Sequence, residues 1–225
     1  MIILGLDTCL DACSAAVLET GLVRAAASHP MGRGHQEAIA PLVEGVMAQA
    51  GLSFSDLDRV GVTIGPGSFT GLRVGLAFAK GLGAALSIPV VGVGTLAALA
   101  EPLGEDLVFA VIDARRGQVY LQAFARGKAL MAPDALDLAT AAARVAELSA
   151  GRPASLAGSG AYLLADLMPD ARLIGAPACD PVAVARLAGA QASPAIPRPL
   201  YLRAPDARLP GGAPGPDMAP EPVPL

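Results

Sequence analysis

The sequence predicts an α/β protein made of two halves, each a mixed β-sheet with helices packed on it. Three observations support this fold class. Short apolar runs alternate with longer segments of helical periodicity, and one order of predicted elements occurs twice along the chain. Hydrophobic residues also make up 53% of the 225 residues. A chain this apolar can bury a sizeable core, which excludes global disorder.

The first hundred residues predict the more complete of the two sheets. Three short apolar runs joined by tight turns predict neighbouring antiparallel strands at 2–6, 14–18 and 22–28. Strands then alternate with helices, which predicts parallel crossovers, in the order helix 35–50, strand 59–64, helix 70–86 and strand 89–93. Pro41 interrupts the first of these helices, so the helix either begins after His35 or bends at the proline.

The second half repeats this order in a shortened form. Its predicted elements are a hairpin of strands 107–113 and 118–125, a helix at 138–148, a strand at 154–157, a helix at 161–167, a strand at 172–174 and a helix at 182–192. We therefore divide the chain into residues 1–103 and 104–203, and leave open whether 199–203 return to the first half. Residues 204–225 contain seven prolines and three glycines and are predicted to be a disordered tail.

The charge balance and the cysteine count narrow the class of protein. The net charge is −4, and the longest basic run is Arg115–Arg116, which argues against a free-standing nucleic-acid binder. Three cysteines are too few for a disulfide framework and favour a reducing compartment. The uncharged stretch 81–100 is long enough to span a bilayer, but Pro89 and four glycines divide it into shorter buried elements. We expect a cytoplasmic protein.

The most distinctive stretch is GPGSFTGLRVG at residues 65–75, directly after the strand predicted at 59–64. Its first three residues predict a tight exit from the strand, and Ser68 or Thr70 can cap the helix that follows. A glycine-rich turn at a helix N-terminus can also bind an anion. The alternative is a cap and turn with no ligand.

The helix after this turn has an apolar arc about 200° wide, whereas a surface helix with one covered side needs roughly 100°. Only Arg73 and Lys80 mark a polar stripe on this helix. Gly71, Gly75 and Ala79 recur every four residues, a spacing that allows another backbone to come close. Either the helix lies wholly inside the chain, or one side of it contacts a second protein. We favour the protein contact.

Five segments together resemble a known family. They are ILGLDTC at 3–9, GHQEAIAPLV at 34–43, GPGSFTGLRVG at 65–75, DARRGQVY at 113–120 and PLYLR at 199–203. Together they are similar to the bacterial TsaB family. The resemblance implies two RNase H-like halves of the actin-like ATPase superfamily. It also implies a non-catalytic subunit that binds and activates a TsaD-like threonylcarbamoyltransferase, which forms N6-threonylcarbamoyladenosine at tRNA position 37.

The resemblance further implies the partners and their mode of contact. A TsaE-like ATPase is the second expected partner, the chain alone is expected to form a homodimer, and tRNA is expected to be bound only through the complex. The partner's active arrangement would be favoured by a population shift. The resemblance and the wide apolar arc together predict that the partner or dimer interface lies on helices 35–50 and 70–86. The residues expected in it are His35, Ile39, Leu42, Val46, Phe69, Thr70, Gly71, Leu72, Arg73, Gly75, Leu76 and Ala79.

The chain itself offers little for catalysis. Its two histidines, His29 and His35, lack the one-turn spacing of a metal-binding pair, so we predict no catalytic residue and no metal ligand. Asp7 and Thr8 match the superfamily's nucleotide position, and the alternative is that they satisfy the turn. Arg115–Arg116 stand where a glycine-rich phosphate turn is expected. We expect no intrinsic cofactor, with ATP and a metal on the partner. A self-sufficient ATPase or sugar kinase, a peptidase and direct tRNA binding are the rival hypotheses.

Overall fold

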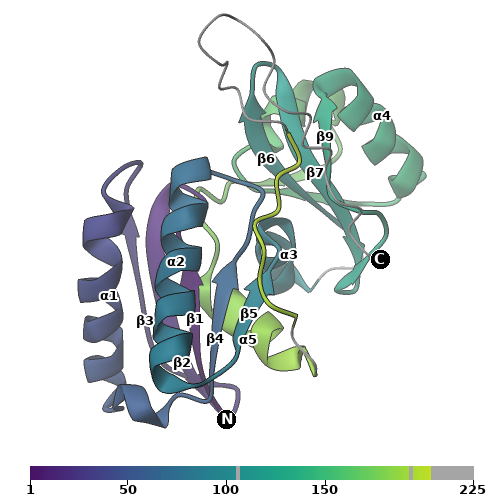
Figure 1. The fold of residues 1–225 in the computed structure, drawn as a ribbon. Coiled ribbons are helices and arrows are strands. Elements are labelled where there is room, and N and C mark those ends of the chain that lie inside the picture. The colour runs from purple at the N-terminus through teal and green to yellow at the C-terminus, as the bar shows by residue number, and fades with distance from the viewer. Residues whose placement is uncertain (105–106, 193–194, 204–225) are drawn as a thin grey trace, which may run out of the picture.

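The computed structural model describes residues 1–104, 107–192 and 195–203, and it contains two β-sheets, each with helices packed against it (Figure 1). The first sheet has the strand order β3-β2-β1-β4-β5. Its strands are β1 (Ile2–Asp7), β2 (Ala12–Glu19), β3 (Leu22–Pro30), β4 (Arg59–Thr63) and β5 (Val90–Val93). The first three strands along the chain pair antiparallel, whereas β1, β4 and β5 pair parallel, so the sheet is mixed as predicted.

Three helices cover this sheet. Figure 1 shows α1 (His35–Ala50) and α2 (Phe69–Leu86) on one face and α5 (Pro181–Ala190) on the other. α1 begins at His35 and continues through Pro41, which lies on its exposed side. The proline therefore does not delay the start of the helix.

The alternation of side chains along β1 explains these two layers. Leu4 and Leu6 belong to the core that α1 and α2 cover, whereas Ile3 belongs to the core that contains α5. The close approach of α5 depends on two glycines, because a Cβ at Gly5 or at Gly61 would overlap α5. α5 lies in the sequence range assigned to the second half, but it packs on the first sheet.

The second sheet has the strand order β11-β10-β6-β7-β8, with β9 also paired to β7. Its strands are β6 (Val108–Arg115), β7 (Gln118–Ala125), β8 (Lys128–Ala129), β9 (Asp134–Asp137), β10 (Ser155–Ala157) and β11 (Arg172–Ile174). The helical elements beside it are α3 (Thr95–Ala100), α4 (Leu138–Ser149) and the 3-10 helix η3 (Ala161–Leu167). Two further 3-10 turns, η1 (Phe54–Asp56) and η2 (Glu101–Leu103), lie in the connections.

The two sheets are joined by a shared hydrophobic core and by a C-terminal segment that contacts both halves. One hydrophobic cluster contains side chains of β6 together with side chains of α3 and α5. The C-terminal segment (195–203) also contacts both halves, because the Leu200 N–H donates to the Ile64 carbonyl (2.7 Å) and the Arg203 guanidinium donates to the Ala114 carbonyl (2.9 Å). The predicted tail at 204–225 lies outside the described residues.

The apolar stretch 81–100 is divided as predicted, among the end of α2, β5 and α3. Within the described residues, no helix has the length and apolar character needed to cross a membrane.

Candidate functional site

The glycine-rich segment after β4 forms the turn into α2. Ser68 is the N-cap of the helix, because its Oγ accepts the Gly71 N–H (3.2 Å), whereas Thr70 is exposed. The Ser68 N–H donates to the Cys9 carbonyl in the β1–β2 turn (2.7 Å). The start of α2 is therefore fixed to the first hairpin of the chain.

The glycine spacing in α2 does accommodate another backbone, but this backbone belongs to the same chain. A Cβ at Gly71 would overlap the Thr8 carbonyl oxygen, and a Cβ at Gly75 would overlap Thr8 Oγ1. Thr8 Oγ1 donates to the Gly71 carbonyl (2.7 Å). Ala79, the third member of the series, is fully buried. The small residues of α2 thus face the chain's own β1–β2 turn and core, not a second polypeptide.

The twelve candidate interface residues divide sharply by exposure. Three are exposed, namely Phe69, Thr70 and Arg73. The other nine are buried inside the chain: His35, Ile39, Leu42, Val46, Gly71, Leu72, Gly75, Leu76 and Ala79. Most of the wide apolar arc of α2 therefore belongs to the first half's own core, where α1 and the sheet cover it.

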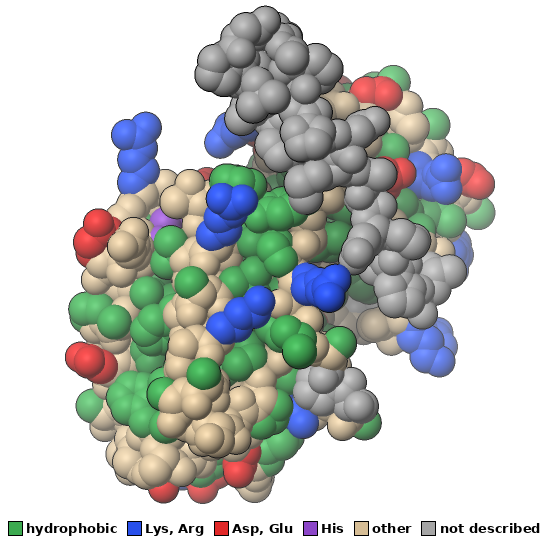
Figure 2. All heavy atoms as spheres, viewed as in Figure 1, with side chains coloured by type: hydrophobic (Ala, Val, Ile, Leu, Met, Phe, Trp, Pro, Cys, Tyr) green, Lys and Arg blue, Asp and Glu red, His purple; other side chains and the backbone are tan. Residues whose placement is uncertain are grey.

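An apolar groove remains on the outer side of these helices. A cavity of about 530 Å³ lies between α1 and α2, lined by Gln36, Ile39, Phe69, Thr70, Arg73, Val74, Ala77 and Phe78. Phe69 keeps 44% of its surface exposed. Figure 2 shows hydrophobic side chains over α1 and α2 on this face, with basic side chains among them. We call this surface the α1–α2 groove.

Four of the residues that line the groove are absent from the interface that the sequence predicts. Gln36, Val74, Ala77 and Phe78 are the missed residues. On α2, Val74 and Ala77 follow Thr70 and Arg73 by four residues, so they lie on the same side of the helix. Because Gly71 faces the β1–β2 turn, this other side is the outer one.

Arg73 lies at the edge of the groove with its side chain held in place. Its guanidinium carbon lies 3.7 Å from the centroid of the Phe69 ring, which is the geometry of a cation–π contact. Its Nε–H donates to the Tyr201 hydroxyl (3.2 Å), and the Phe69 and Tyr201 rings are 5.5 Å apart. The C-terminal segment therefore contributes directly to this face.

The two candidate nucleotide-binding residues are buried. Asp7 has no exposed surface, and its carboxylate accepts hydrogen bonds from the N–H groups of Cys9 (3.0 Å) and Cys179 (3.3 Å) and from the Thr63 hydroxyl (2.7 Å). Burial raises the pKa of this carboxyl above its usual 3.8, and the hydrogen bonds partly oppose the shift. Thr8 is 1% exposed. These contacts match the alternative in which the two side chains satisfy the turn.

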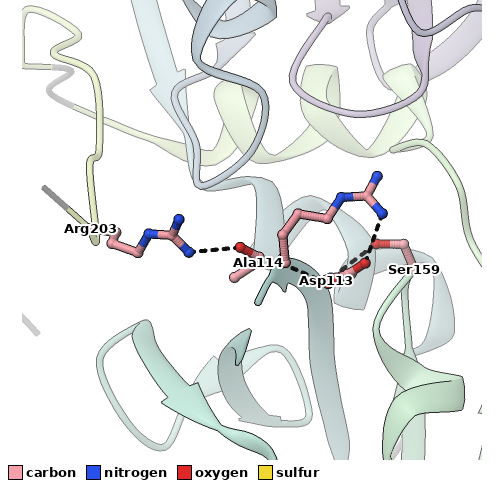
Figure 3. Close-up of polar contacts among 5 residues, drawn as sticks. Asp113, Ala114, Ser159 and Arg203 are labelled. Carbon is pink, nitrogen blue, oxygen red and sulfur yellow. Dashed lines mark hydrogen bonds and ion pairs between the residues drawn. The ribbon is translucent and has the colours of Figure 1, made fainter. Parts of the chain in front are cut away.

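In the corresponding turn of the second half, between β6 and β7, side chains contact one another and the turn backbone (Figure 3). Arg115 pairs with the Asp113 carboxylate (3.1 Å), and the Asp113 N–H donates to Ser159 Oγ (3.2 Å). Arg203 reaches the Ala114 carbonyl from the other side. The Arg115 side chain is thus paired at this turn but stays 79% exposed, so it lies largely in solvent and does not fill the turn as the sequence predicts.

Neither the histidines nor the cysteines belong to a metal-binding group within the described residues, although Cys9 and Cys179 both lie against the Asp7 carboxylate. His35 is buried at the start of α1, and its Nε2 has no hydrogen-bond partner among the described residues. The described part of the chain contains no group of three or more His, Cys, Asp or Glu side chains that could hold a metal ion. All three cysteines are free thiols and buried.

Comparison with known proteins gives consistent matches. The family model for TsaD, described as tRNA N6-adenosine threonylcarbamoyltransferase, matches residues 28–167. The tRNA threonylcarbamoyladenosine biosynthesis protein TsaB of Escherichia coli is 38% identical over 130 residues, which cover 56% of each chain. An uncharacterized Mycobacterium bovis protein is 36% identical over 177 residues, or 78% of each chain. The match to the E. coli protein thus spans little more than half of its length.

A solved structure matches most of the chain. YeaZ from Pseudomonas aeruginosa superposes with a TM-score of 0.75 at 30% identity, covering 89% of this chain and 99% of that one. This likeness and the two mixed sheets confirm the predicted α/β fold of two RNase H-like halves.

Proposed function

The chain belongs to the TsaB family, and from this premise we propose that it is a non-catalytic subunit that binds and activates a TsaD-like threonylcarbamoyltransferase. The complex would form N6-threonylcarbamoyladenosine at tRNA position 37 in the cytoplasm. A TsaE-like ATPase is the second partner, and ATP and a metal belong to the partner subunits. The chain forms a homodimer when alone and meets tRNA only within the complex.

The α1–α2 groove is the observation on which this proposal depends. Exposed apolar surface bordered by polar residues is typical of a protein-binding site. The groove offers the ring of Phe69, together with Val74 and Phe78, which are partly exposed. Covering such surface yields about 25 cal/mol for each Å² of apolar area removed from water. A partner helix that fills the groove therefore gains binding energy that the isolated chain lacks.

The buried candidates support this surface from below. Leu72 and Leu76 of α2, with Leu42 and Val46 of α1, pack in the core beneath it. The groove is therefore preformed, and docking needs little reordering of the chain. A fixed surface of this kind can favour one conformation of a partner, because only the matching arrangement makes all the contacts.

Charge introduced into the groove tests the docking surface. Ala77 is exposed on α2 and lines the groove, so Ala77→Glu should abolish co-purification with the TsaD-like subunit while far-UV circular dichroism of the isolated chain stays unchanged. Ala143 is an exposed alanine inside α4 of the second half, and Ala143→Glu is the matched control. A complex that survives Ala77→Glu would refute docking at the groove.

The non-catalytic part of the proposal needs its own measurement. Calorimetry of the isolated chain with Mg-ATP should show neither micromolar binding nor turnover, because Asp7 and Thr8 are enclosed by the chain. Binding with turnover would favour the ATPase hypothesis instead. Threonylcarbamoylation of tRNA by the chain without a TsaD-like subunit would also contradict the proposal.

A further inference from the structure

Among the described residues, Arg73 is the one basic side chain that lines the α1–α2 groove. Its side chain is exposed, yet two aromatic residues fix its position: the Phe69 ring lies under the guanidinium at 3.7 Å, and the Tyr201 hydroxyl accepts its Nε–H at 3.2 Å. Within the described residues no carboxylate forms an ion pair with it. The guanidinium is thus held in one place without an anionic partner.

Tyr201 is itself placed by backbone contacts. The Leu200 N–H donates to the Ile64 carbonyl (2.7 Å), directly after β4. The Leu200 carbonyl lies so close to Gly65 that a Cβ there would be 2.7 Å from the oxygen. The C-terminal segment therefore passes the glycine-rich turn at a fixed distance. Tyr201, which is 128 residues from Arg73 in the sequence, meets Arg73 for this reason.

The arrangement leaves the terminal amino groups of Arg73 available. A guanidinium has five N–H donors in a planar fork, and the hydrogen bond to Tyr201 uses only the Nε–H. The two terminal groups form the end of the fork that matches the two oxygens of a carboxylate. Holding the fork in advance removes part of the side-chain entropy cost of binding.

The charge of α2 indicates the chemistry of the occupant. The helix carries Arg73 and Lys80 and no acidic residue, so its outer face is apolar and basic. Complementary surfaces pair opposite charges at their edges and apolar groups at their centre. The matching surface therefore carries an apolar side chain for the groove and a carboxylate beside it.

We propose that Arg73 is a carboxylate receptor: an Asp or Glu on the docking helix of the TsaD-like subunit binds its guanidinium while a neighbouring apolar side chain fills the groove. Phe69 and Tyr201 are positioning residues for the receptor, which makes the C-terminal segment part of partner recognition. This inference rests on the proposed function, and it adds the kind of side chain that the partner must present.

Calorimetric titration of the chain with the TsaD-like subunit tests the receptor. Arg73→Gln removes the charge and should weaken binding roughly tenfold to a hundredfold, the range for a hydrogen-bonded ion pair. Arg73→Lys should also weaken binding, because it keeps the charge but loses the fork. Lys80→Gln is the matched control, since Lys80 lies two turns further along the same exposed side, and it should change the affinity less than about threefold.

Tyr201→Phe tests the positioning role, because it removes only the hydroxyl and keeps the ring against Phe69. It should weaken binding about threefold to tenfold in the native background and have almost no effect in the Arg73→Gln background, since the two side chains act as a unit. Thermal unfolding of each variant should match that of the native chain.

The outcomes separate this inference from the proposed function. Native affinity in Arg73→Gln, with the complex lost in Ala77→Glu, would overturn the receptor and leave the docking surface in place. Equal losses in Arg73→Gln and Lys80→Gln would also overturn it, because general electrostatic attraction would explain both. A loss confined to self-association would assign the receptor to a second copy of the chain, again overturning the proposal. An intact complex in both Ala77→Glu and Arg73→Gln would refute docking at the groove, and with it the receptor, whereas failure of the native chain to bind the TsaD-like subunit would refute the proposed function itself.

Discussion

Gly71→Ala is expected to destabilise the chain even though alanine is the better helix former. A Cβ at Gly71 would overlap the Thr8 carbonyl oxygen, and a backbone atom cannot swing away as a flexible side chain can. Separating the two segments would also break the hydrogen bond from Thr8 Oγ1 to the Gly71 carbonyl. Overpacking costs about 1–3 kcal/mol and the lost hydrogen bond about 1 kcal/mol, whereas the helix propensity gained is about 1 kcal/mol. The net loss in unfolding free energy is therefore about 1–3 kcal/mol.

Urea unfolding followed by far-UV circular dichroism measures this change, and the same helix supplies the control. Gly81 is exposed, and a Cβ there would meet nothing within 4 Å. Gly81→Ala should therefore stabilise the chain by up to about 1 kcal/mol. The two glycine substitutions should thus have opposite signs. If Gly71→Ala stabilised the chain as Gly81→Ala does, the close contact between α2 and the β1–β2 turn would be refuted.

Two predictions concern buried ionisable groups. Burial raises the pKa of the Asp7 carboxyl above 3.8, so its contribution to stability is complete below pH 3.8 and is lost as the pH rises through the folded-state pKa. An NMR titration of the Asp7 carboxyl carbon measures that pKa, and a value at or below 3.8 would contradict the burial argument. Burial also raises the pKa of Cys9 to about 12 and that of Cys13 to about 11. Both thiols should react with a thiol-specific reagent far more slowly in the folded chain than in urea, and equal rates would show that they are accessible.

The order of elements in the first half could be predicted because its periodicities are unambiguous. The three β-strands, the helix over 35–50 and the alternation after it all occur where the pattern places them. The sheet on which α5 packs could not be predicted in this way, since an apolar helix face does not specify what it covers. Gly5 and Gly61 were the available signal, because glycines inside central strands mark a close approach.

The candidate interface was only partly predictable for a similar reason. Hydrophobic periodicity identifies which side of a helix is covered, but a core and a protein partner cover it equally well. In α2, the glycine series was interpreted as a contact with another protein, whereas Thr8 of the same chain occupies that position. The exposed side of α2, with Phe69, Arg73 and Ala77, can be identified only when the contacts of the buried side are known.

The two sides of α2 therefore depend on one another. The buried side fixes the rotation of the helix through Gly71 and Thr8, and this rotation presents Arg73 beside the groove. Tyr201 completes the same face from a segment that is anchored at Ile64 in one half and, through Arg203, in the other. A change in the buried contact should then weaken both folding and partner binding, whereas a change confined to the groove should weaken binding alone. Comparing Gly71→Ala with Ala77→Glu in both measurements separates a helix that is wrongly placed from a surface that is wrongly charged.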